Sequence, residues 1–247
     1  MIRAALGILA AAFAAVMTVT GSARAQECGS LVHRERAFTV CTADLDRHDV
    51  SLHLLAGDGQ PLGSFARLAR DLGTEPIFAT NGGMYHQDRR PVGLYIEDRD
   101  EAKRIVTREG PGNFGLLPNG VFCVREDRAD VIESRAFAAD PPGCLHATQS
   151  GPMLVVDGAL HPRFLPDSTS SKFRNGVGAD PDGRRVHFAI SDEPVTFHEM
   201  ATLFRDVLGV RDALFLDGTI SRLWAPGLNR QDAGVRMGPI IAVTEKD

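Results

Sequence analysis

Three apolar stretches of the chain each end in a side chain that can take part in polar chemistry: Asn81, Asp192 and Asp217. The clearest is 213–216, which is followed directly by Asp217 and Gly218. An apolar run of this length that stops at a turn residue is typical of a buried strand. If the three strands lie side by side, two carboxylates and an amide converge at one edge, a rigid support for catalysis. The alternative interpretation is three ordinary turns, because Asn, Asp and Gly are common turn residues.

Arg174 is the cation that best complements these carboxylates. It opens an expected strand among small residues that let a ligand approach the backbone, namely Asn175, Gly176, Gly178 and Ala179. A guanidinium group binds a phosphate or carboxylate through two parallel hydrogen bonds. A structural ion pair with Asp192 or Asp217 is the other interpretation, and the two are compatible. Tyr85 and His86, close behind Asn81, are further candidates for substrate contact.

The elements expected to position these residues are mostly short strands. Alternating or wholly apolar stretches predict strands near 38–45, 50–55, 76–80, 92–96, 114–117, 121–124, 147–150, 153–156, 174–178, 186–190, 213–216 and 239–243. Pro118-Asn-Gly120 is a turn signal that indicates a hairpin between 114–117 and 121–124. Residues 133–145 are expected to be a surface connection. Residues 161–173, rich in Ser and Pro, predict a loop that borders a cleft.

Apolar residues at helical spacing predict two helices. Residues 65–72 have Ser64 as the N-terminal cap and Gly73 as the stop. The second helix begins near Thr196 and places one apolar face inward, made of Phe197, Met200, Ala201, Phe204, Val207 and Leu208. Glu199 falls in its first turn, where an acidic group complements the helix dipole. The balance predicts an α+β fold, a single compact domain with a strand-rich mixed sheet core and two or three helices.

Residues 1–25 have the pattern of an export signal. A basic start at Arg3 precedes an Ala-rich apolar stretch, and Ala23-Arg-Ala25 matches a cleavage site. A membrane anchor is the alternative, but it needs about 20 uninterrupted apolar residues, and Thr, Gly and Ser interrupt this stretch. Cleavage near Ala25 would leave residues 26–247 as one periplasmic or secreted domain with no membrane span.

The charge of the chain restricts its partners. The 27 Lys and Arg residues face 32 Asp and Glu residues, a net charge of −5. Without Arg3 and Arg24 the 25 remaining basic residues face the same 32 acidic ones, a net charge of −7. Nucleic acids and anionic membranes bind through Lys and Arg that neutralise phosphates, so neither is an expected partner.

The four cysteines all lie beyond the expected signal, at Cys28, Cys41, Cys123 and Cys144. In an exported protein an even number of cysteines indicates disulfides. Three pairings are possible, and we favour the two local ones, Cys28 with Cys41 and Cys123 with Cys144.

No motif predicts a cofactor or a metal site. The chain has no C-x-x-C, H-E-x-x-H, G-x-S-x-G or Walker loop, and its eight histidines lack metal-ligand spacing. Residues 110–115 match G-x-G-x-x-G, but Pro111 lies inside the motif and the following residues continue as strands. A dinucleotide site needs a helix at that point. We therefore expect neither a cofactor nor a bound metal.

Six short motifs follow one another in a distinctive order. They are Asn81-Gly82-Gly83-Met-Tyr, Gln149-Ser-Gly-Pro-Met-Leu-Val-Val-Asp-Gly, Arg174-Asn-Gly-Val-Gly, Ile-Ser-Asp192, Phe-His-Glu199-Met-Ala and Leu-Asp217-Gly218-Thr-Ile-Ser221. Their order and spacing, over about residues 75–245, resemble the phosphodiester glycosidase family. Two positions depart from that family. One of its branches has Leu-Asp-Gly-Gly-Gly-Ser where this chain has Thr219 and Ile220, and the Asp-Gly after a strand is here Asp192-Glu193. Both changes lie where a pocket is expected, so the family's sugar specificity does not transfer.

The resemblance implies hydrolysis of a sugar-1-phosphodiester at the anomeric C–O bond. A phosphomonoester leaves readily, so neutralising its charge matters more than protonating it, and Arg174 is the candidate for that role. Asp217 or Asp192 would stabilise the oxocarbenium-like centre or activate water. The substrate would be a carbohydrate or glycosyl phosphate.

The remaining motif residues would surround the substrate. Polar side chains would hydrogen-bond sugar hydroxyls or phosphate oxygens, and glycines would keep the backbone close to the ligand; these residues are Asn81, Gln149, Ser221, Gly82, Gly83 and Gly218. Glu199 is expected to tie the helix start to the edge rather than to react. Two other function classes stay open, a non-catalytic glycan-binding protein and a metal-dependent phosphodiesterase that cleaves P–O.

Overall fold

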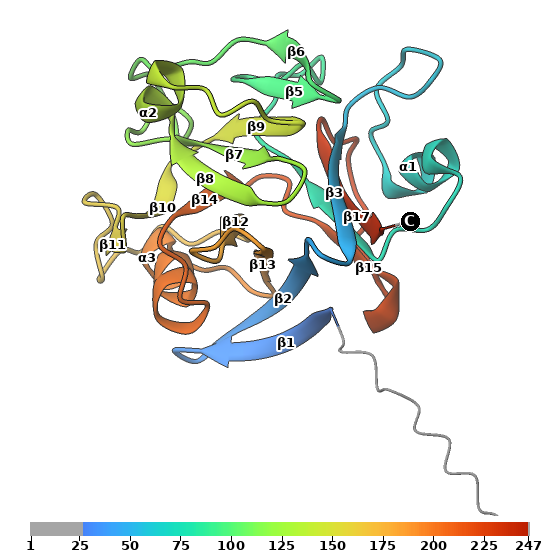
Figure 1. Cartoon of the computed structure of the whole chain (residues 1–247). Helices are drawn as coiled ribbons and strands as arrows, with labels where there is room; N and C mark the ends of the chain where they lie inside the picture. Colours follow the sequence, from blue (N-terminus) through green and yellow to red (C-terminus); the bar gives the residue numbers. More distant parts are fainter. Residues whose placement is uncertain (1–26, 247) are drawn as a thin grey trace, which may run out of the picture.

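The structure is a computed structural model that describes residues 27–246, so the expected export signal lies outside the described residues. The described chain is strand-rich, with three antiparallel sheets and three short α-helices (Figure 1). The α+β class predicted from the sequence is confirmed. The described strand pairs are all antiparallel, so the sheets are antiparallel rather than mixed.

The largest sheet has seven strands and carries the ends of two of the three predicted strands. In spatial order they are β1 (Cys28–His33), β2 (Arg36–Asp44), β13 (Arg185–Ser191), β12 (Asn175–Ala179), β14 (Ala213–Asp217), β10 (Met153–Val156) and β11 (Ala159–Leu160). Because β13 and β14 both run antiparallel to β12, their C-terminal ends lie beside the N-terminal end of β12, which we call one edge of the sheet. Ser191, Asn175 and Asp217 therefore lie at one edge of this sheet.

Two five-stranded sheets pack around the first. One consists of β16 (Arg230–Gln231), β15 (Leu223–Ala225), β4 (Phe78–Asn81), β17 (Ile240–Glu245) and β3 (His48–His53). The other consists of β6 (Asp100–Lys103), β5 (Tyr95–Glu97), β9 (His146–Ser150), β7 (Gly120–Val124) and β8 (Ala129–Glu133), drawn at the upper left of Figure 1. The strand that ends at Asn81 thus belongs to a different sheet from the strands that end before Asp192 and at Asp217.

The core lies where the three sheets meet. Phe188 of β13 packs its ring against Phe78 of β4, with centroids 5.5 Å apart, and against Phe122 of β7, at 5.8 Å. Each sheet contributes one of these rings, and all three side chains are buried. Contact between aromatic rings at these distances and tilted angles is favourable. The sheets are therefore held by one shared apolar core.

The first helix follows the sequence prediction closely. Helix α1 (Phe65–Leu72) begins where the Ser64 side chain accepts a hydrogen bond from the Arg67 N–H, and it ends at Gly73 with φ 70°. A left-handed residue at this position favours glycine. None of the helices described between residues 27 and 246 is long and apolar enough to cross a membrane.

The second predicted helix differs in its last part. Helix α3 (Phe197–Thr202) has the expected cap, since Thr196 and Glu199 form a reciprocal capping box. Residues Leu203–Val207 then form a π-helical turn. A π turn adds a residue to the repeat and rotates the following side chains. Val207 is consequently 47% exposed, so its assignment to the inward apolar face was wrong.

The segment between residues 110 and 145 contains two further corrections. Residues 114–117 form turns instead of a strand, and β7 pairs with β8 and β9. Asn119 is not a hairpin tip, because it is fully buried and its amide donates to the Phe114 carbonyl while its Oδ1 accepts from Ser134. The expected surface connection contains helix α2 (Ser134–Ala139). A short 3₁₀ helix, η2 (Pro226–Leu228), completes the described elements.

Both predicted disulfides are confirmed. Cys28 and Cys41 lie directly opposite each other on β1 and β2, with Cα atoms 4.0 Å apart. Cys123 of β7 is bonded to Cys144, which lies just before β9. The first disulfide holds the outermost strand of the seven-stranded sheet.

Candidate active site

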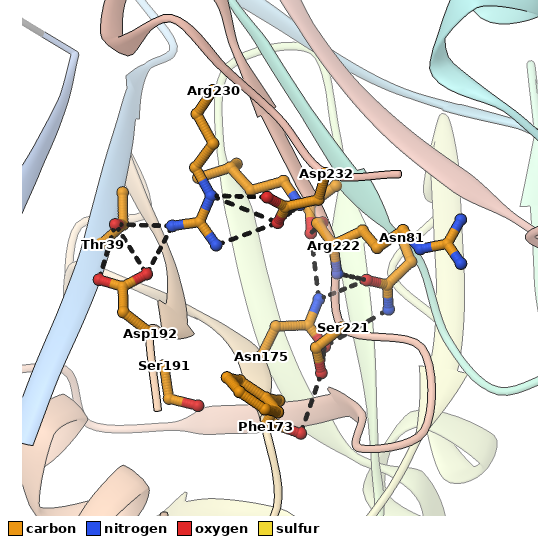
Figure 2. A network of polar contacts seen from close by, with 12 residues as sticks. Thr39, Asn81, Phe173, Asn175, Ser191, Asp192, Ser221, Arg222, Arg230 and Asp232 are labelled. Atoms are coloured by element: carbon orange, nitrogen blue, oxygen red, sulfur yellow. Dashed lines mark hydrogen bonds and ion pairs between the residues drawn. The ribbon is translucent and has the colours of Figure 1, made fainter. Parts of the chain in front are cut away.

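Two asparagines join the seven-stranded sheet to the β4 sheet at the edge where Asp217 lies. The amide of Asn175 donates to Asn81 Oδ1 at 3.0 Å, and the amide of Asn81 donates back to Asn175 Oδ1 at 3.4 Å. Asn175 Oδ1 also accepts the backbone N–H of Asp217 at 3.1 Å, and Asn81 Oδ1 accepts that of Arg222. Figure 2 shows Asn81, Asn175 and Arg222 within this network. Both side chains are buried and paired, so they position the residues around them.

Asp217 begins a tight turn, residues 217–220, that follows strand β14. Its Oδ1 accepts the backbone N–H groups of Thr219 at 2.6 Å and Ile220 at 3.1 Å. Oδ2 has no hydrogen-bond donor within the described chain. The residue is 8% exposed. One carboxylate oxygen therefore fixes the side chain while the other stays available to a ligand.

A hollow of about 420 Å³ opens at this turn. One wall is the turn itself, with Asp217 and Gly218. The loop from Met84 to Val92 also lines the hollow and contributes Tyr85, His86 and Arg89, and Asn113 and Val235 complete the lining. We call this space the Asp217 hollow. Tyr85 and His86, the further candidates for substrate contact, thus line the same hollow as Asp217.

Tyr85 is held firmly at the base of the 84–92 loop. Its hydroxyl donates to the Arg236 carbonyl, and a side chain at Gly238 would collide with its ring. Burial, and next the nearby Asp217 charge, raise the pKa of Tyr85 above its ordinary value. The phenol is therefore neutral at physiological pH.

Arg174 lies beneath the turn and does not line the hollow. Its guanidinium stacks on the Phe197 ring at 3.7 Å and donates to the carbonyls of Val195 and Ser170. The third nitrogen, Nη1, is buried and has no partner within residues 27–246; it lies 3.6 Å from the point where a side chain on Gly218 would begin. Burial lowers the pKa of Arg174 to about 10, so the group remains charged at neutral pH.

The alternative of an ion pair between Arg174 and Asp192 or Asp217 does not hold in the described structure. Asp192 instead binds Arg230 at 2.5 Å and accepts a hydrogen bond from Thr39, and Arg230 continues to Asp232 (Figure 2). Asp192 follows Ser191 at the same sheet edge, yet it is absent from the lining of the hollow. Its charge is compensated, which leaves Asp217 as the better candidate for chemistry.

Four other predicted site residues are hydrogen-bonded or closely packed within the protein. The Gln149 side chain is buried and bonds only backbone, accepting from Leu94 and Val106 and donating to Val106. The Ser221 hydroxyl donates to the Asp217 carbonyl at 2.8 Å. Side chains on the two glycines after Asn81 would collide with Pro239 at 3.0 Å for Gly82 and with Gln149 and Thr148 at 2.5 Å for Gly83. These residues shape the site from behind, so we do not assign them substrate contacts.

Glu199 caps α3 and lies at a separate hollow. Burial raises the pKa of its carboxyl, but hydrogen bonds from the Thr196 N–H and from Arg36 outweigh this and hold it below its ordinary value. With Arg36 and the 161–173 loop it borders a space of about 380 Å³. The predicted loop therefore borders a hollow, but not the one that contains Asp217.

Sequence reasoning missed Arg89, Asn113 and Asn175. Asn175 was noted only as a small residue, although an asparagine that opens a strand of glycines is an unusual choice for a β position. Arg89 lies eight residues after Asn81 in a polar stretch with no periodicity. No sequence signal separates it from the neighbouring Arg90, because their difference arises from the loop conformation. Within the described residues no group of three His, Cys, Asp or Glu side chains is arranged to hold a metal.

Comparison with known proteins assigns the chain to a family. The profile of the phosphodiester glycosidase family matches residues 74–243, which include both asparagines and the Asp217 turn. The chain belongs to the phosphodiester glycosidase family. It is also 35% identical over 180 residues to the uncharacterized Escherichia coli (strain K12) protein YigE, covering 72% of this chain and 70% of YigE. Membership supports a glycosidase-type function and a glycan-type substrate.

Solved structures share the fold of this chain. The zebrafish N-acetylglucosamine-1-phosphodiester α-N-acetylglucosaminidase catalytic domain, auto-inhibited by its pro-peptide, superposes with a TM-score of 0.60 at 14% identity, over 89% of this chain and 82% of that domain. A Burkholderia pseudomallei K96243 protein described as exported superposes with a TM-score of 0.58 at 12% identity, over 85% and 74% of the two chains. At these identities the similarity concerns the fold alone.

Proposed function

We propose that this protein is an exported hydrolase that cleaves the anomeric C–O bond of a glycosyl phosphodiester. The observation that carries the proposal is the Asp217 carboxylate, fixed through Oδ1 and available through Oδ2 at the wall of a hollow large enough for a sugar. A carboxylate held by backbone N–H groups is preorganised, so little rearrangement is needed when positive charge develops at C1.

The proposed hydrolysis needs one carboxylate, a water molecule and a phosphate leaving group. The C1–O bond breaks with its electron pair moving to the phosphate oxygen, while water supplies a hydroxyl to C1 and releases a proton. Asp217 stabilises the oxocarbenium-like carbon or accepts that proton. The phosphomonoester leaves as an anion and needs no strong acid, which is consistent with a wall that has no carboxyl group besides Asp217 among the described residues.

Arg174 serves this proposal from behind the turn. Its charge lies under Gly218 and has no carboxylate partner in the described chain, so it contributes positive potential to the floor of the site. Low surrounding polarity strengthens that potential. We assign Arg174 a positioning and electrostatic role instead of the direct phosphate contact expected from the sequence.

Export is part of the proposal. The pattern of residues 1–25 supports it, and so do the two disulfides, because such bonds persist in oxidising compartments. N-terminal sequencing of the protein recovered from a periplasmic or culture fraction tests it. The expected first residue is Gln26, and recovery of the uncut chain from the cytoplasm would count against export.

Isotope labelling tests the bond that breaks. The purified protein is incubated with a panel of sugar-1-phosphodiesters in oxygen-18 water, and the phosphate product is analysed by mass spectrometry. Phosphate oxygens do not exchange with water, whereas the C1 oxygen of a free sugar does, so the phosphate is the reliable product to read. The proposal predicts unlabelled phosphate; labelled phosphate would indicate P–O cleavage and a phosphodiesterase.

Two controls complete the experiment. Asp217→Asn keeps Oδ1 for the turn but removes the charge, so it should fold normally and release product at least about a hundredfold more slowly, which excludes a contaminating hydrolase. Addition of a chelator should leave turnover unchanged, whereas loss of activity would favour the metal-dependent alternative. Absence of turnover by the wild-type protein on every diester, together with sugar binding, would support the glycan-binding alternative.

A further inference from the structure

Arg89 is a cation at the wall of the Asp217 hollow without a carboxylate partner within residues 27–246. Its only described side-chain contact is with Tyr85, whose ring centroid lies 5.5 Å from the guanidinium carbon. The adjacent Arg90 differs on each count, because it is largely exposed, does not line the hollow and forms an ion pair with Asp88 at 2.6 Å. The loop therefore neutralises one arginine and leaves the other facing the site.

The backbone directs Arg89 to this position. The His86 N–H donates to the Arg90 carbonyl and the Arg89 N–H to the His86 carbonyl, each at 2.8 Å, which closes a tight loop. Within it Arg89 has a φ of 73°, in the left-handed region that disfavours a side chain. Such a conformation persists when its surroundings impose it, and it is found at ligand sites. Tyr85, itself fixed, supplies a surface on which the guanidinium rests.

Arg89 and Asp217 line the same hollow without forming an ion pair in the described chain. A carboxylate and a guanidinium that leave each other unpaired can each meet a group of opposite charge on one ligand. A glycosyl phosphodiester offers that pattern, since positive charge develops at C1 and the attached phosphate is an anion. A guanidinium group matches phosphate oxygens through two N–H donors.

We infer that Arg89 forms the phosphate subsite of the Asp217 hollow and selects substrates whose leaving group is an anionic phosphate. This inference rests on the proposed function for its assignment to a leaving group. The anion-binding step itself requires no turnover, so it can be measured separately. Arg174, buried beneath the turn and absent from the lining of the hollow, takes no part in direct contact with this phosphate.

The test compares wild type with Arg89→Gln, Arg89→Lys and the matched control Arg90→Gln. Gln and Lys keep a side chain at the left-handed position, so the strain at residue 89 changes little. Binding of inorganic phosphate is measured by titration calorimetry at constant ionic strength, with chloride as the reference anion. We expect Arg89→Gln to weaken phosphate binding about tenfold or more, Arg89→Lys to weaken it less, and Arg90→Gln to bind like wild type.

A kinetic comparison separates this inference from the proposed function. Where a diester is turned over, Arg89→Gln should lower kcat/KM for it about tenfold or more but leave a neutral-leaving-group glycoside of the same sugar nearly unaffected. Turnover with equal phosphate binding in wild type and Arg89→Gln would overturn the subsite and leave the proposed function standing. Phosphate binding lost only in the Arg89 variants, without turnover of any diester, would support the subsite and contradict the proposed function. Wild type that binds no phosphate would overturn the subsite.

Discussion

Arg174 and Arg89 both lie near the Asp217 turn, but in different environments. Arg174 is 1% exposed, stacked on an aromatic ring and bonded to two carbonyls, whereas Arg89 is partly exposed on a loop and lines the hollow. The sequence analysis favoured Arg174 as the ligand-binding arginine because it opens a strand among glycines. The structure shows that those glycines serve packing, since side chains on Gly176 and Gly178 would collide with Leu154 and Val210. Rigid strands support the site here, and a loop supplies its accessible cation.

The largest effect is expected at the Asp217 carboxylate. Asp217→Asn should lower turnover of a diester substrate by about 10²–10⁴-fold, because a positioned carboxylate contributes on that scale. Asp192→Asn should lower the same turnover by less than about tenfold, because this carboxylate does not line the hollow. Steady-state kinetics on both variants measures the difference. Equal losses would show that the Arg230-paired carboxylate takes part in the reaction.

The next largest effect tests the buried arginine. Arg174→Met removes the donors to two carbonyls and leaves that of Ser170 without its described partner, while that of Val195 keeps the Lys172 N–H. With the stacking on Phe197 also lost, we expect a loss of about 2–4 kcal/mol in the free energy of unfolding. Arg174→Lys should also destabilise, because an ammonium group cannot stack and bond both carbonyls at once. Urea unfolding followed by circular dichroism measures the change. A stability equal to wild type would contradict the structural role of this side chain.

His53, a partly buried histidine that does not line the hollow, allows effects on stability to be separated from effects on activity. Burial lowers the pKa of His53 to about 4, with a smaller contribution from His146. The unfolded chain then takes up this proton first, so the stabilisation is complete above about pH 6.5 and is lost as the pH falls toward about 4. We expect a loss of about 1–3 kcal/mol over this window. His53→Gln should reduce that dependence, measured by urea unfolding at several pH values, without changing kcat/KM at pH 7.

Glu97, near His53, contributes to stability with the opposite pH dependence. Burial raises the pKa of its carboxyl above the ordinary value, so its contribution to stability is present at low pH and lost as the pH rises. The comparison of wild type with His53→Gln cancels this contribution. An unchanged pH dependence in the variant would show that His53 is not the group responsible.

The smallest effect is expected on the stability of the protein when Arg89, the arginine on the loop, is replaced. Arg89→Gln should change the free energy of unfolding by less than about 0.5 kcal/mol, because its side chain forms no hydrogen bond or ion pair in the described structure. The comparison with Arg174→Met in the same urea experiment separates a structural from a ligand-binding arginine. A large loss at Arg89 would remove that distinction.

Much of the scaffold could be predicted from local patterns. Strand β14 followed by Asp217, the β12–β13 hairpin, the caps of α1 and α3 and both disulfides depend on residues near one another in the chain. The orientation of polar side chains at the strand ends could not be predicted in this way. Asn81 pairs with Asn175 across two sheets, and Gln149 turns toward backbone 43 residues away, so their roles depend on how the sheets pack.

Two other features depend on local backbone conformation, which the periodicity of apolar residues does not predict. The π turn after α3 moves Val207 to the surface, and the left-handed conformation of Arg89 distinguishes it from Arg90. Both follow from how backbone hydrogen bonds close locally. For the same reason the accessible side of the site was harder to predict than its buried support.

A crystal structure of Asp217→Asn with an intact glycosyl phosphodiester tests the central claim most directly. The account predicts the anomeric carbon next to residue 217 and the phosphate against the Arg89 guanidinium, in the hollow between the 84–92 loop and the 217–220 turn. A diester bound at the separate hollow beside Glu199, or a phosphate that reaches Arg174 while Arg89 stays unoccupied, would contradict it.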